Sequence, residues 1–433
     1  MSKKMIKRVF KFGGASVKDA EGIRNVLRVL QHQGTKDVCV VVSAMGKTTN
    51  AMETVVSSYY QAKKNQPESV LEVVKEALSP IQAYHQTIIE DLFGAQSAPV
   101  KAKVDLLFEE MHGFLTWNKS LNHSFIYDQI VGYGELLSTT IVSDFLNAEG
   151  VANRLLDIRQ YIKTDSVYRD ASVQWQQTVE RVQRLNTQGE LLVTQGFLGS
   201  DANNFTTTLG REGSDYTAAI LAYAFDAESV SIWKDVPGVL NADPRAFENA
   251  VQLHQVSYTE AIELAFYGAS VIHPKTLQPL QRKGIPLYVR SFIDLENPGT
   301  CVTAGSPLVP EVPCYIVKKN QVLLELATQD FSFMAEHHLS SVFELFSKYQ
   351  LKVDLIQNSA ISFRVCLDNR FDQFDALVSD LEKDYVAKFQ KGVALYTIRH
   401  FDDNAYEALP PTAEIVLEQR TGETLQLVAA FAE

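Results

Sequence analysis

A short apolar run that ends abruptly at two glycines constrains the fold of this chain more than any other stretch. Residues 9–12 contain one lysine, Lys11, and are followed by Gly13-Gly14-Ala15-Ser16. This pattern predicts a buried strand whose following backbone N–H groups turn outward and form a cradle for an anion. From residue 19 onward apolar side chains recur at helical spacing, and the N-terminus of such a helix also favours negative charge. The stretch therefore predicts a phosphate-binding element with Lys11 beside it.

The sequence of strand, small-residue loop and helix occurs again further along the chain. Residues 37–43 contain a continuous β-branched run, as found in parallel strands that are buried on both faces, and residues 191–197 are interpreted as another buried strand. Each run leads into a loop that is rich in small or hydroxyl-bearing residues. The pattern predicts an α/β fold with a mainly parallel sheet. Because ligands bind at the carboxyl ends of such strands, the loops are expected to converge on one site.

A helical, largely polar segment interrupts this pattern at residues 51–122. Three prolines, Pro67, Pro80 and Pro99, are expected to break it into separate helices. The segment predicts a helical excursion from the sheet and carries no chemistry of its own.

A glycine-rich stretch at residues 130–138 begins like a dinucleotide fingerprint. Leu137 takes the place of the third glycine and no clear strand precedes the stretch, which argues against a nicotinamide site. The alternative is a glycine turn that presents Glu135 at the start of a helix. On spacing alone, a plain capping role for Glu135 is as good an explanation as a functional one.

A second candidate anion site follows the strand at residues 191–197. Arg211 stands in a turn between two glycines, where an arginine is exposed and directed outward. Ser214 and Asp215 come next, and they fit either a helix cap or the anion site. Lys234, after a further strand, is an additional candidate, together with Asp235 and Arg245.

Composition excludes several classes of function. The formal net charge of −12 argues against a basic nucleic-acid-binding surface. The four cysteines are far apart and show no CxxC spacing, so reduced thiols in a cytoplasmic protein are expected rather than disulfides or a zinc site. We expect no signal peptide and no membrane span, because no apolar run is long enough.

A Pro/Gly-rich stretch predicts a domain boundary near residue 305. We assign residues 1–304 to one domain and 315–433 to a second region. The expected element order after residue 320 is β-α-β-β-α-β, which is typical of a ferredoxin-like module. Residues 400–413 leave no room for the full helix of a second module, so that module is predicted to be shortened.

Taken in order, the motifs resemble those of aspartate kinases, which have the three-layer α/β/α amino-acid kinase fold and C-terminal regulatory modules of the ACT type. Each motif alone is weak, but the ordered set is specific and covers almost the whole chain. The matching stretches are Lys11-Phe12-Gly13-Gly14-Ala15-Ser16, Ser43-Ala44-Met45-Gly46, Gly134-Glu135-Leu136-Leu137-Ser138, Gly210-Arg211-Glu212-Gly213-Ser214-Asp215, Asp235-Val236-Pro237-Gly238, Asp243-Pro244-Arg245 and Gly268-Ala269-Ser270-Val271-Ile272-His273-Pro274.

The resemblance implies transfer of the ATP γ-phosphate to the side-chain carboxylate of L-aspartate, the first step of lysine, threonine and methionine synthesis. It implies ATP with Mg²⁺ held by phosphate oxygens, and no protein metal site. The roles that it implies fall into three sets. Catalytic roles fall to Lys11 and to Asp215, which is expected to orient Lys11 or the substrate amine. Aspartate binding falls to Thr49, Glu135, Arg211, Ser43 and Ser214. Nucleotide binding falls to Lys11, Gly13, Gly14, Ser16, Lys234, Asp235, Leu240, Arg245, Ser270 and Val271.

Several positions depart from the family pattern. Ala15 stands where threonine is more common, and Glu212 stands where glycine is common. Lys234 replaces a common threonine, while Ser270 stands where a nucleotide-contacting lysine is frequent. We expect Lys234 to supply the phosphate-binding charge that Ser270 lacks.

The C-terminal region departs further. His337-His338 stand where lysine-sensitive relatives have a glycine beside the effector, and Ala360 stands where an acidic residue is common. The resemblance still implies a homodimer or higher homo-oligomer through this region, and an amino-acid effector whose identity the sequence leaves open. Two alternatives to the main hypothesis are a kinase for another acidic amino acid and a non-catalytic amino-acid sensor.

Overall fold

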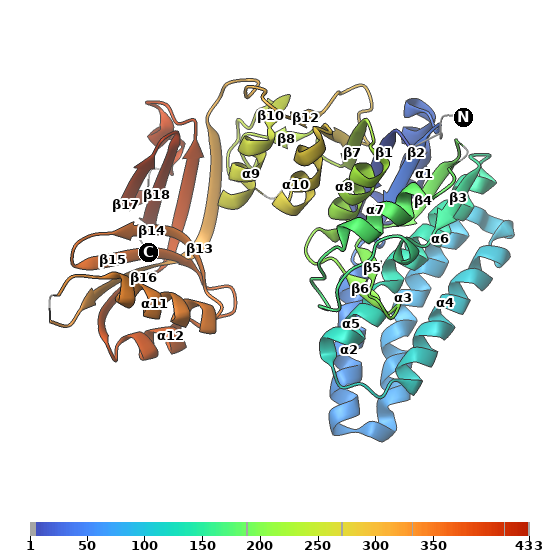
Figure 1. Cartoon of the computed structure of the whole chain (residues 1–433), viewed down its shortest axis with the longest axis horizontal. Helices are drawn as coiled ribbons and strands as arrows, with labels where there is room; N and C mark the ends of the chain where they lie inside the picture. Colours follow the sequence, from blue (N-terminus) through green and yellow to red (C-terminus); the bar gives the residue numbers. More distant parts are fainter. Residues whose placement is uncertain (1–5, 188, 270–271, 331, 411, 432–433) are drawn as a thin grey trace. The chain divides into compact units, whose positions relative to one another are not determined.

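The computed structural model describes residues 6–187, 189–269, 272–330, 332–410 and 412–431 (Figure 1). The chain divides into two compact units. The first comprises the chain up to Val239, with His254–Ile262 and Ile272–Leu308. The second comprises Leu240–Leu253, the described part of Glu263–Val271, and the chain from Val309 onward.

The first unit is built on an eight-stranded sheet with the order β10-β12-β11-β7-β1-β2-β4-β3. All neighbouring strands are parallel except β11 and β12, which are antiparallel. The prediction of a mainly parallel sheet is therefore confirmed. The strands are β1 (Arg8–Phe12), β2 (Val38–Val42), β3 (Asn153–Leu156), β4 (Leu191–Gln195), β7 (Ser229–Lys234), β10 (Gln255–Ser257), β11 (Leu287–Ser291) and β12 (Thr300–Thr303).

The burial of the central strands explains why their sequences are largely apolar. Every residue of β2 and β4 is buried, because helices cover both faces of the sheet. In β1, Lys11 pairs in register with Val41 of β2 on one side and with Ile232 of β7 on the other. A lysine at the centre of such a sheet needs a compensating charge.

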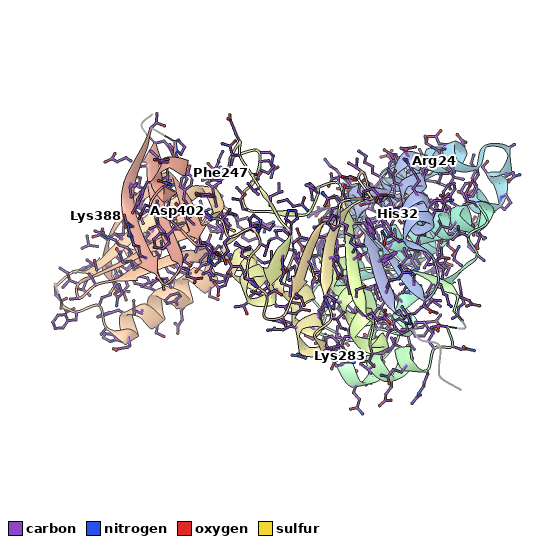
Figure 2. The ribbon with its side chains drawn as sticks, turned by 90° about the horizontal axis from the view of Figure 1, so that it is seen from above. Arg24, His32, Phe247, Lys283, Lys388 and Asp402 are labelled. Atoms are coloured by element: carbon purple, nitrogen blue, oxygen red, sulfur yellow. The ribbon has the colours of Figure 1, made fainter. Side chains whose placement is uncertain are left out.

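Helices pack around this sheet. The helix α8 packs on β1 and β7, with α7 and α10 beside it, and α6 packs on β3 and β4. Figure 2 shows Arg24 and His32 on α1, and Lys283, which pairs with Asp226 at the end of α8. These helices and α9 are α1 (Ala20–Gln33), α6 (Tyr133–Ala148), α7 (Trp175–Gln183), α8 (Gly213–Phe225), α9 (Tyr258–Tyr267) and α10 (Pro274–Lys283).

The helical excursion is present as α2 (Thr48–Asn65), α3 (Val70–Phe93), α4 (Ala98–Trp117) and α5 (His123–Val131) (Figure 1). Pro67 and Pro99 lie at helix starts, as expected. The prediction of a break at Pro80 is wrong, because this proline lies inside α3. The missing N–H of Pro80 removes one hydrogen bond of α3, and buried neighbours such as Leu78 and Ile81 keep the helix packed.

The second unit contains a six-stranded antiparallel sheet with the order β14-β15-β13-β16-β18-β17. Two strands of 15 residues each, β13 and β16, run through both halves of this sheet. The elements are β13 (Cys314–Thr328), α11 (Glu336–Lys348), β14 (Lys352–Asn358), β15 (Ser362–Asp368), α12 (Phe374–Leu381), β16 (Tyr385–Arg399), β17 (Ala413–Thr421) and β18 (Thr424–Phe431). The predicted ferredoxin-like order is confirmed.

Between β16 and β17 the described residues form a short 3-10 turn, Ala405–Ala408. Two short two-stranded sheets complete the structure. One is β5 (Leu198–Ser200) with β6 (Thr206–Thr208), and the other is β8 (Val239–Leu240) with β9 (Gln252–Leu253).

Candidate active site

A cavity of about 540 Å³ lies in the first unit, where several parallel strands end. β2 lies on one side of β1 and β7 on the other, so the order of the strands changes direction at β1. In open α/β sheets this switch point is the usual ligand site. The predicted site residues that line the cavity are Lys11, Gly14, Ser43, Thr49, Glu135, Arg211, Ser214, Asp215 and Lys234.

Lys11 and Asp215 form a nearly buried ion pair in this cavity. The distance from Lys11 Nζ to Asp215 Oδ1 is 2.6 Å, and the two side chains are 10% and 4% exposed. The charge required by a lysine within the central strand thus comes from the first turn of α8. This pairing keeps Lys11 extended toward the end of β1, where it lines the cavity.

Glu135 is the most strongly perturbed acid of the site. Its side chain lies in the first turn of α6, and the residue is only 2% exposed. Oε1 accepts the N–H of Ala44 at 3.2 Å, and Oε2 has no hydrogen-bond partner among the described residues. Burial raises the pKa of Glu135 to about 8, although the Ala44 N–H and the charge of Lys11 act in the opposite direction. An unpartnered buried oxygen beside a cavity is a site for a cationic ligand group.

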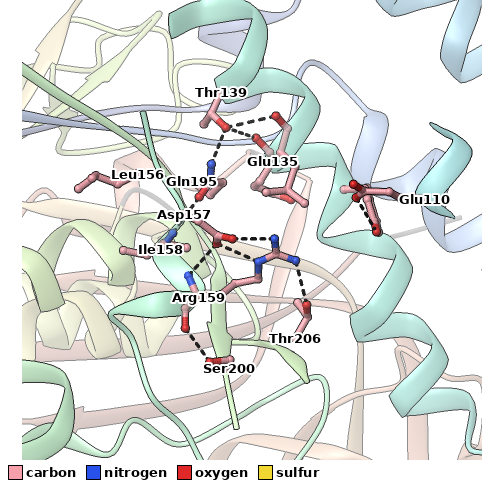
Figure 3. A network of polar contacts seen from close by, with 12 residues as sticks. Glu110, Glu135, Thr139, Leu156, Asp157, Ile158, Arg159, Gln195, Ser200 and Thr206 are labelled. Atoms are coloured by element: carbon pink, nitrogen blue, oxygen red, sulfur yellow. Dashed lines mark hydrogen bonds and ion pairs between the residues drawn. The ribbon is translucent and has the colours of Figure 1, made fainter. Parts of the chain in front are cut away.

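Figure 3 shows the contacts that hold the helix of Glu135 in place. Thr139 Oγ1 donates to the carbonyl of Glu135 at 2.8 Å and accepts from Gln195 Nε2 at 2.8 Å. Gln195 ends β4, and its Oε1 accepts the N–H of Ile158 at 3.0 Å. These buried hydrogen bonds tie α6 to the strand beside it, and they fix the position of Glu135 at the cavity.

The N-terminal turns of three helices point toward the cavity. Thr49 lies in the first turn of α2, Glu135 in that of α6, and Ser214 and Asp215 in that of α8. The N–H groups at helix starts have no partner within their helix and carry partial positive charge. Together with Lys11 they form an environment that favours an anion.

Glycines allow the loops to approach closely at the cavity. A Cβ on Gly14 would lie 2.7 Å from the carbonyl oxygen of Ala44, and one on Gly196 would lie 2.4 Å from Ser214 Oγ. Neither position has room for a side chain, because the obstacles include backbone atoms. Gly14, one of the two glycines that suggested an anion cradle in the sequence, is therefore required by packing.

The cations of the cavity differ in how they are held. Arg211 is exposed, and it makes no hydrogen bond or ion pair with the residues that the structure describes. Lys234 is half-buried at the end of β7. Arg211 is thus available to an anionic ligand, which agrees with its expected exposure.

Other predicted residues lie elsewhere. Ser16 is buried, and its hydroxyl donates to the carbonyl of Trp233 at 3.2 Å. A Cβ on Gly13 would approach Lys11 Nζ at 3.2 Å, which places the Gly13 backbone close to that ammonium. Asp235 is exposed just after β7.

Leu240 and Arg245 belong to the second unit, where Arg245 pairs with Asp243 at 2.7 Å. Ser270 and Val271 lie outside the described residues.

Some cavity residues were not predicted. Phe197 is the second residue after β4, so its place after a strand was a signal that could have identified it. Tyr127 and Arg169 also line the cavity, but Tyr127 comes from α5 and Arg169 comes from a loop. No glycine motif or preceding strand marks either of them in the sequence.

Two features are absent from the described residues. Among them, no three or more His, Cys, Asp or Glu side chains are grouped so that they could hold a metal ion. In the same part of the chain, no helix combines the length and apolar character needed to cross a membrane.

Comparison with known proteins adds family information to this geometry. The model of the amino acid kinase family matches residues 7–291. Lysine-sensitive aspartokinase 3 of Escherichia coli (strain K12) is 30% identical over 365 residues, which are 83% of this chain and 78% of that protein. Aspartokinase 2, chloroplastic, of Arabidopsis thaliana is 30% identical over 403 residues, which are 88% of this chain and 71% of that protein.

Solved structures agree with these matches. Aspartokinase III of E. coli in complex with lysine and aspartate, in the T-state, superposes with a TM-score of 0.80 and 28% identity, covering 98% of this chain and 95% of that one. The same enzyme in complex with aspartate and ADP, in the R-state, gives a TM-score of 0.77 and 27% identity, covering 98% and 96%.

Proposed function

The chain belongs to the amino acid kinase family and, within it, to the aspartokinases, and from this premise we propose how its cavity phosphorylates L-aspartate. The reaction transfers the γ-phosphate of ATP to the side-chain carboxylate and gives 4-phospho-L-aspartate. The observation that carries this proposal is the meeting of Lys11, Asp215, Glu135 and Arg211 in one cavity at the switch point of the sheet.

Aspartate carries two carboxylates and one ammonium, and the cavity offers a group for each kind of charge. The guanidinium of Arg211 can bind a carboxylate through two parallel hydrogen bonds. The unpartnered Oε2 of Glu135 can accept from the ammonium. Thr49, Ser43 and Ser214 lie along the same cavity and supply hydroxyl donors.

The nucleophile needs no general base, because a carboxylate is already ionised near neutral pH. The difficulty is to bring one anion to another and to stabilise charge on the transferring phosphoryl group. Lys11 can do both, and Asp215 holds its ammonium in position at 2.6 Å. The helix starts around the cavity add partial positive charge.

The nucleotide is proposed to bind with its phosphates toward Gly13, Gly14 and Lys234, with Ser16, Asp235, Leu240, Arg245, Ser270 and Val271 as the further positions that the family pattern assigns. Mg²⁺ is proposed to arrive with ATP and to be held mainly by the phosphate oxygens. When bound, Mg²⁺ neutralises phosphate charge.

The wider biological role is also part of the proposal. We infer that the product enters lysine, threonine and methionine synthesis in the cytoplasm, where the four free cysteines would remain reduced. The ferredoxin-like second unit is proposed to bind an amino-acid effector and to join chains into a homodimer or higher oligomer. The exposed edges of its six-stranded sheet favour such pairing.

An assay of ADP release and acyl-hydroxamate formation tests the activity directly. Aspartate, glutamate and N-acetylglutamate would be compared as acceptors with Mg-ATP, each with and without lysine or threonine. We expect turnover with aspartate and little with the other two. Absence of aspartate-dependent ADP release would refute the proposed function, while the effector additions test the regulatory part separately.

A further inference from the structure

Arg169 lines the active-site cavity although no sequence motif marks it. Its side chain is 42% exposed, and the guanidinium carbon lies 4.2 Å from the ring centroid of Tyr127, which also lines the cavity. Its NH2 group pairs with Glu53 Oε1 of α2 at 3.1 Å. The side chain is thus positioned by an aromatic face and a carboxylate, and part of it remains open to a ligand.

The backbone of Arg169 has an unusual conformation for a residue with a side chain. Its φ of 76° lies in the left-handed region, which glycine adopts without strain and other residues adopt rarely. Such conformations persist when the surrounding structure fixes them, and they are concentrated at functional sites. Phe197 and Glu212, which line the same cavity, also have positive φ values of 68° and 54°.

A buried carboxylate holds Arg169 in this conformation. Both oxygens of Asp128 accept the N–H of Arg169 at 3.1 Å, and Asp128 has no exposed surface. Asp128 also accepts the N–H of Thr208 at 2.9 Å and its hydroxyl at 2.8 Å. The loop of Arg169 is therefore fastened to the end of β6.

This fastening places Arg169 beside the loop that carries Arg211. The N–H of Ala171 donates to the carbonyl of Thr208 at 2.9 Å. At Gly210, next to Arg211, an added Cβ would lie 2.4 Å from Asp170 Oδ1 and 3.4 Å from the Arg169 carbonyl. The two arginines stand on loops in direct contact, and both line the cavity.

We propose that Arg169 is a second substrate-binding arginine, which binds a carboxylate of the dicarboxylic amino acid next to Arg211. This inference rests on the proposed function. A substrate with two carboxylates needs more than one cationic partner, and the proposed function assigns Lys11 to the transferring phosphoryl group. The planar guanidinium of Arg169 suits a carboxylate, and its contact with Tyr127 keeps it oriented before the substrate arrives.

Two other roles for Arg169 make different predictions. If Arg169 only tethers its loop to α2, its partner Glu53 matters equally and the effect falls on stability. If Arg169 binds the nucleotide instead, its loss raises the KM for ATP. Steady-state kinetics with each substrate varied in turn, together with thermal unfolding, separate these roles from carboxylate binding.

The informative variant is Arg169→Gly, because glycine adopts a φ of 76° without strain and removes the guanidinium. We expect its KM for aspartate to rise about 10- to 100-fold, as for the loss of one hydrogen-bonded charge pair. We expect the KM for ATP to change less than about twofold and the unfolding temperature not to fall. Arg169→Lys should be intermediate, because it keeps the charge and loses the planar fork.

Two further variants serve as controls. Glu53→Gln removes the tether and keeps Arg169, so it should not reproduce the rise in aspartate KM. Gln350→Gly relaxes another left-handed position, exposed in the second unit, and should leave the aspartate KM unchanged. An unchanged aspartate KM in Arg169→Gly, an equal rise in the KM for ATP, or an equal effect of Glu53→Gln would overturn the inference. Turnover of the wild-type protein separates this inference from the proposed function. If the proposed kinase activity is wrong, the wild type shows no aspartate-dependent turnover. If only the role of Arg169 is wrong, the wild type is active and Arg169→Gly has an unchanged KM for aspartate.

Discussion

Binding of aspartate should release a proton from Glu135. In the cavity this side chain is buried, its Oε2 has no partner among the described residues, and its pKa is raised to about 8. A carboxyl group with that pKa is roughly nine-tenths protonated at pH 7. The substrate ammonium would give Oε2 a charged partner, and an adjacent positive charge favours the ionised form.

The size of the effect follows from the two pKa values. If the bound carboxylate returns to the ordinary value of 4.5, Glu135 is almost fully ionised at pH 7. About 0.9 proton is then released per bound aspartate. This difference in pKa corresponds to about 5 kcal/mol of favourable interaction between the ionised Glu135 and the bound ligand. The ionisation of Glu135 is thus coupled to binding of the substrate amine.

Isothermal titration of aspartate into the ATP-free protein at pH 7 measures this number. The titration is run in two buffers with different ionisation enthalpies, and the difference between the observed enthalpies gives the protons released. Glu135→Gln, which keeps the shape and cannot ionise, is the matched control. Release should decline as the pH rises above 8, where free Glu135 is already ionised. No release at pH 7, or equal release by the glutamine variant, would contradict the reasoning.

Four other predictions concern the same cavity. Because the pKa of Glu135 is raised in the folded state, its contribution to stability is present below pH 4.5 and is lost as the pH rises through 8. In urea unfolding, the free energy of unfolding of the wild type should therefore fall relative to that of Glu135→Gln over this range. A difference between the two that stays constant with pH would contradict this prediction. Lys11→Ala should lower kcat by at least about 100-fold, with a far smaller change in aspartate affinity, measured by single-turnover kinetics and titration. It also leaves Asp215 buried and unpaired at a cost of about 3–5 kcal/mol, so adding Asp215→Asn should recover stability in thermal melts but not turnover. Lys234→Thr should raise the KM for ATP, and an unchanged value would refute its role in phosphate binding. Gly14→Ala should abolish turnover and lower the melting temperature, because its Cβ would meet a backbone carbonyl at 2.7 Å.

Site residues beside glycine motifs were within reach of sequence reasoning. Lys11 lies in β1, two residues before Gly13, and the loop that follows is expected at the edge where parallel strands end. Glu135 follows Gly134 at the start of α6, where spacing alone left a plain capping role equally open. The ion pair of Lys11 with Asp215 was less accessible, since it joins residues that are far apart in the chain. It was the family resemblance, and not local spacing, that assigned Asp215 to orienting Lys11 or the substrate amine.

Arg169 could not be predicted for a physical reason. Its place at the cavity depends on Asp128, a buried carboxylate of α5. Asp128 accepts the main-chain N–H of Arg169 and so fixes the loop. Such long-range contacts leave no local periodicity or glycine signature. The break expected at Pro80 failed for a similar reason, because tertiary packing in α3 outweighs the local preference of proline.

The two 15-residue strands of the second unit have a consequence for its unfolding. β13 pairs with β15 and β16, and β16 pairs in turn with β18, so the same two backbones supply hydrogen bonds to both halves of the sheet. Neither half can open without exposing the amides of a strand that the other half also needs. Native-state hydrogen exchange should therefore show β13 and β16 opening as one cooperative unit, with a single shared opening free energy.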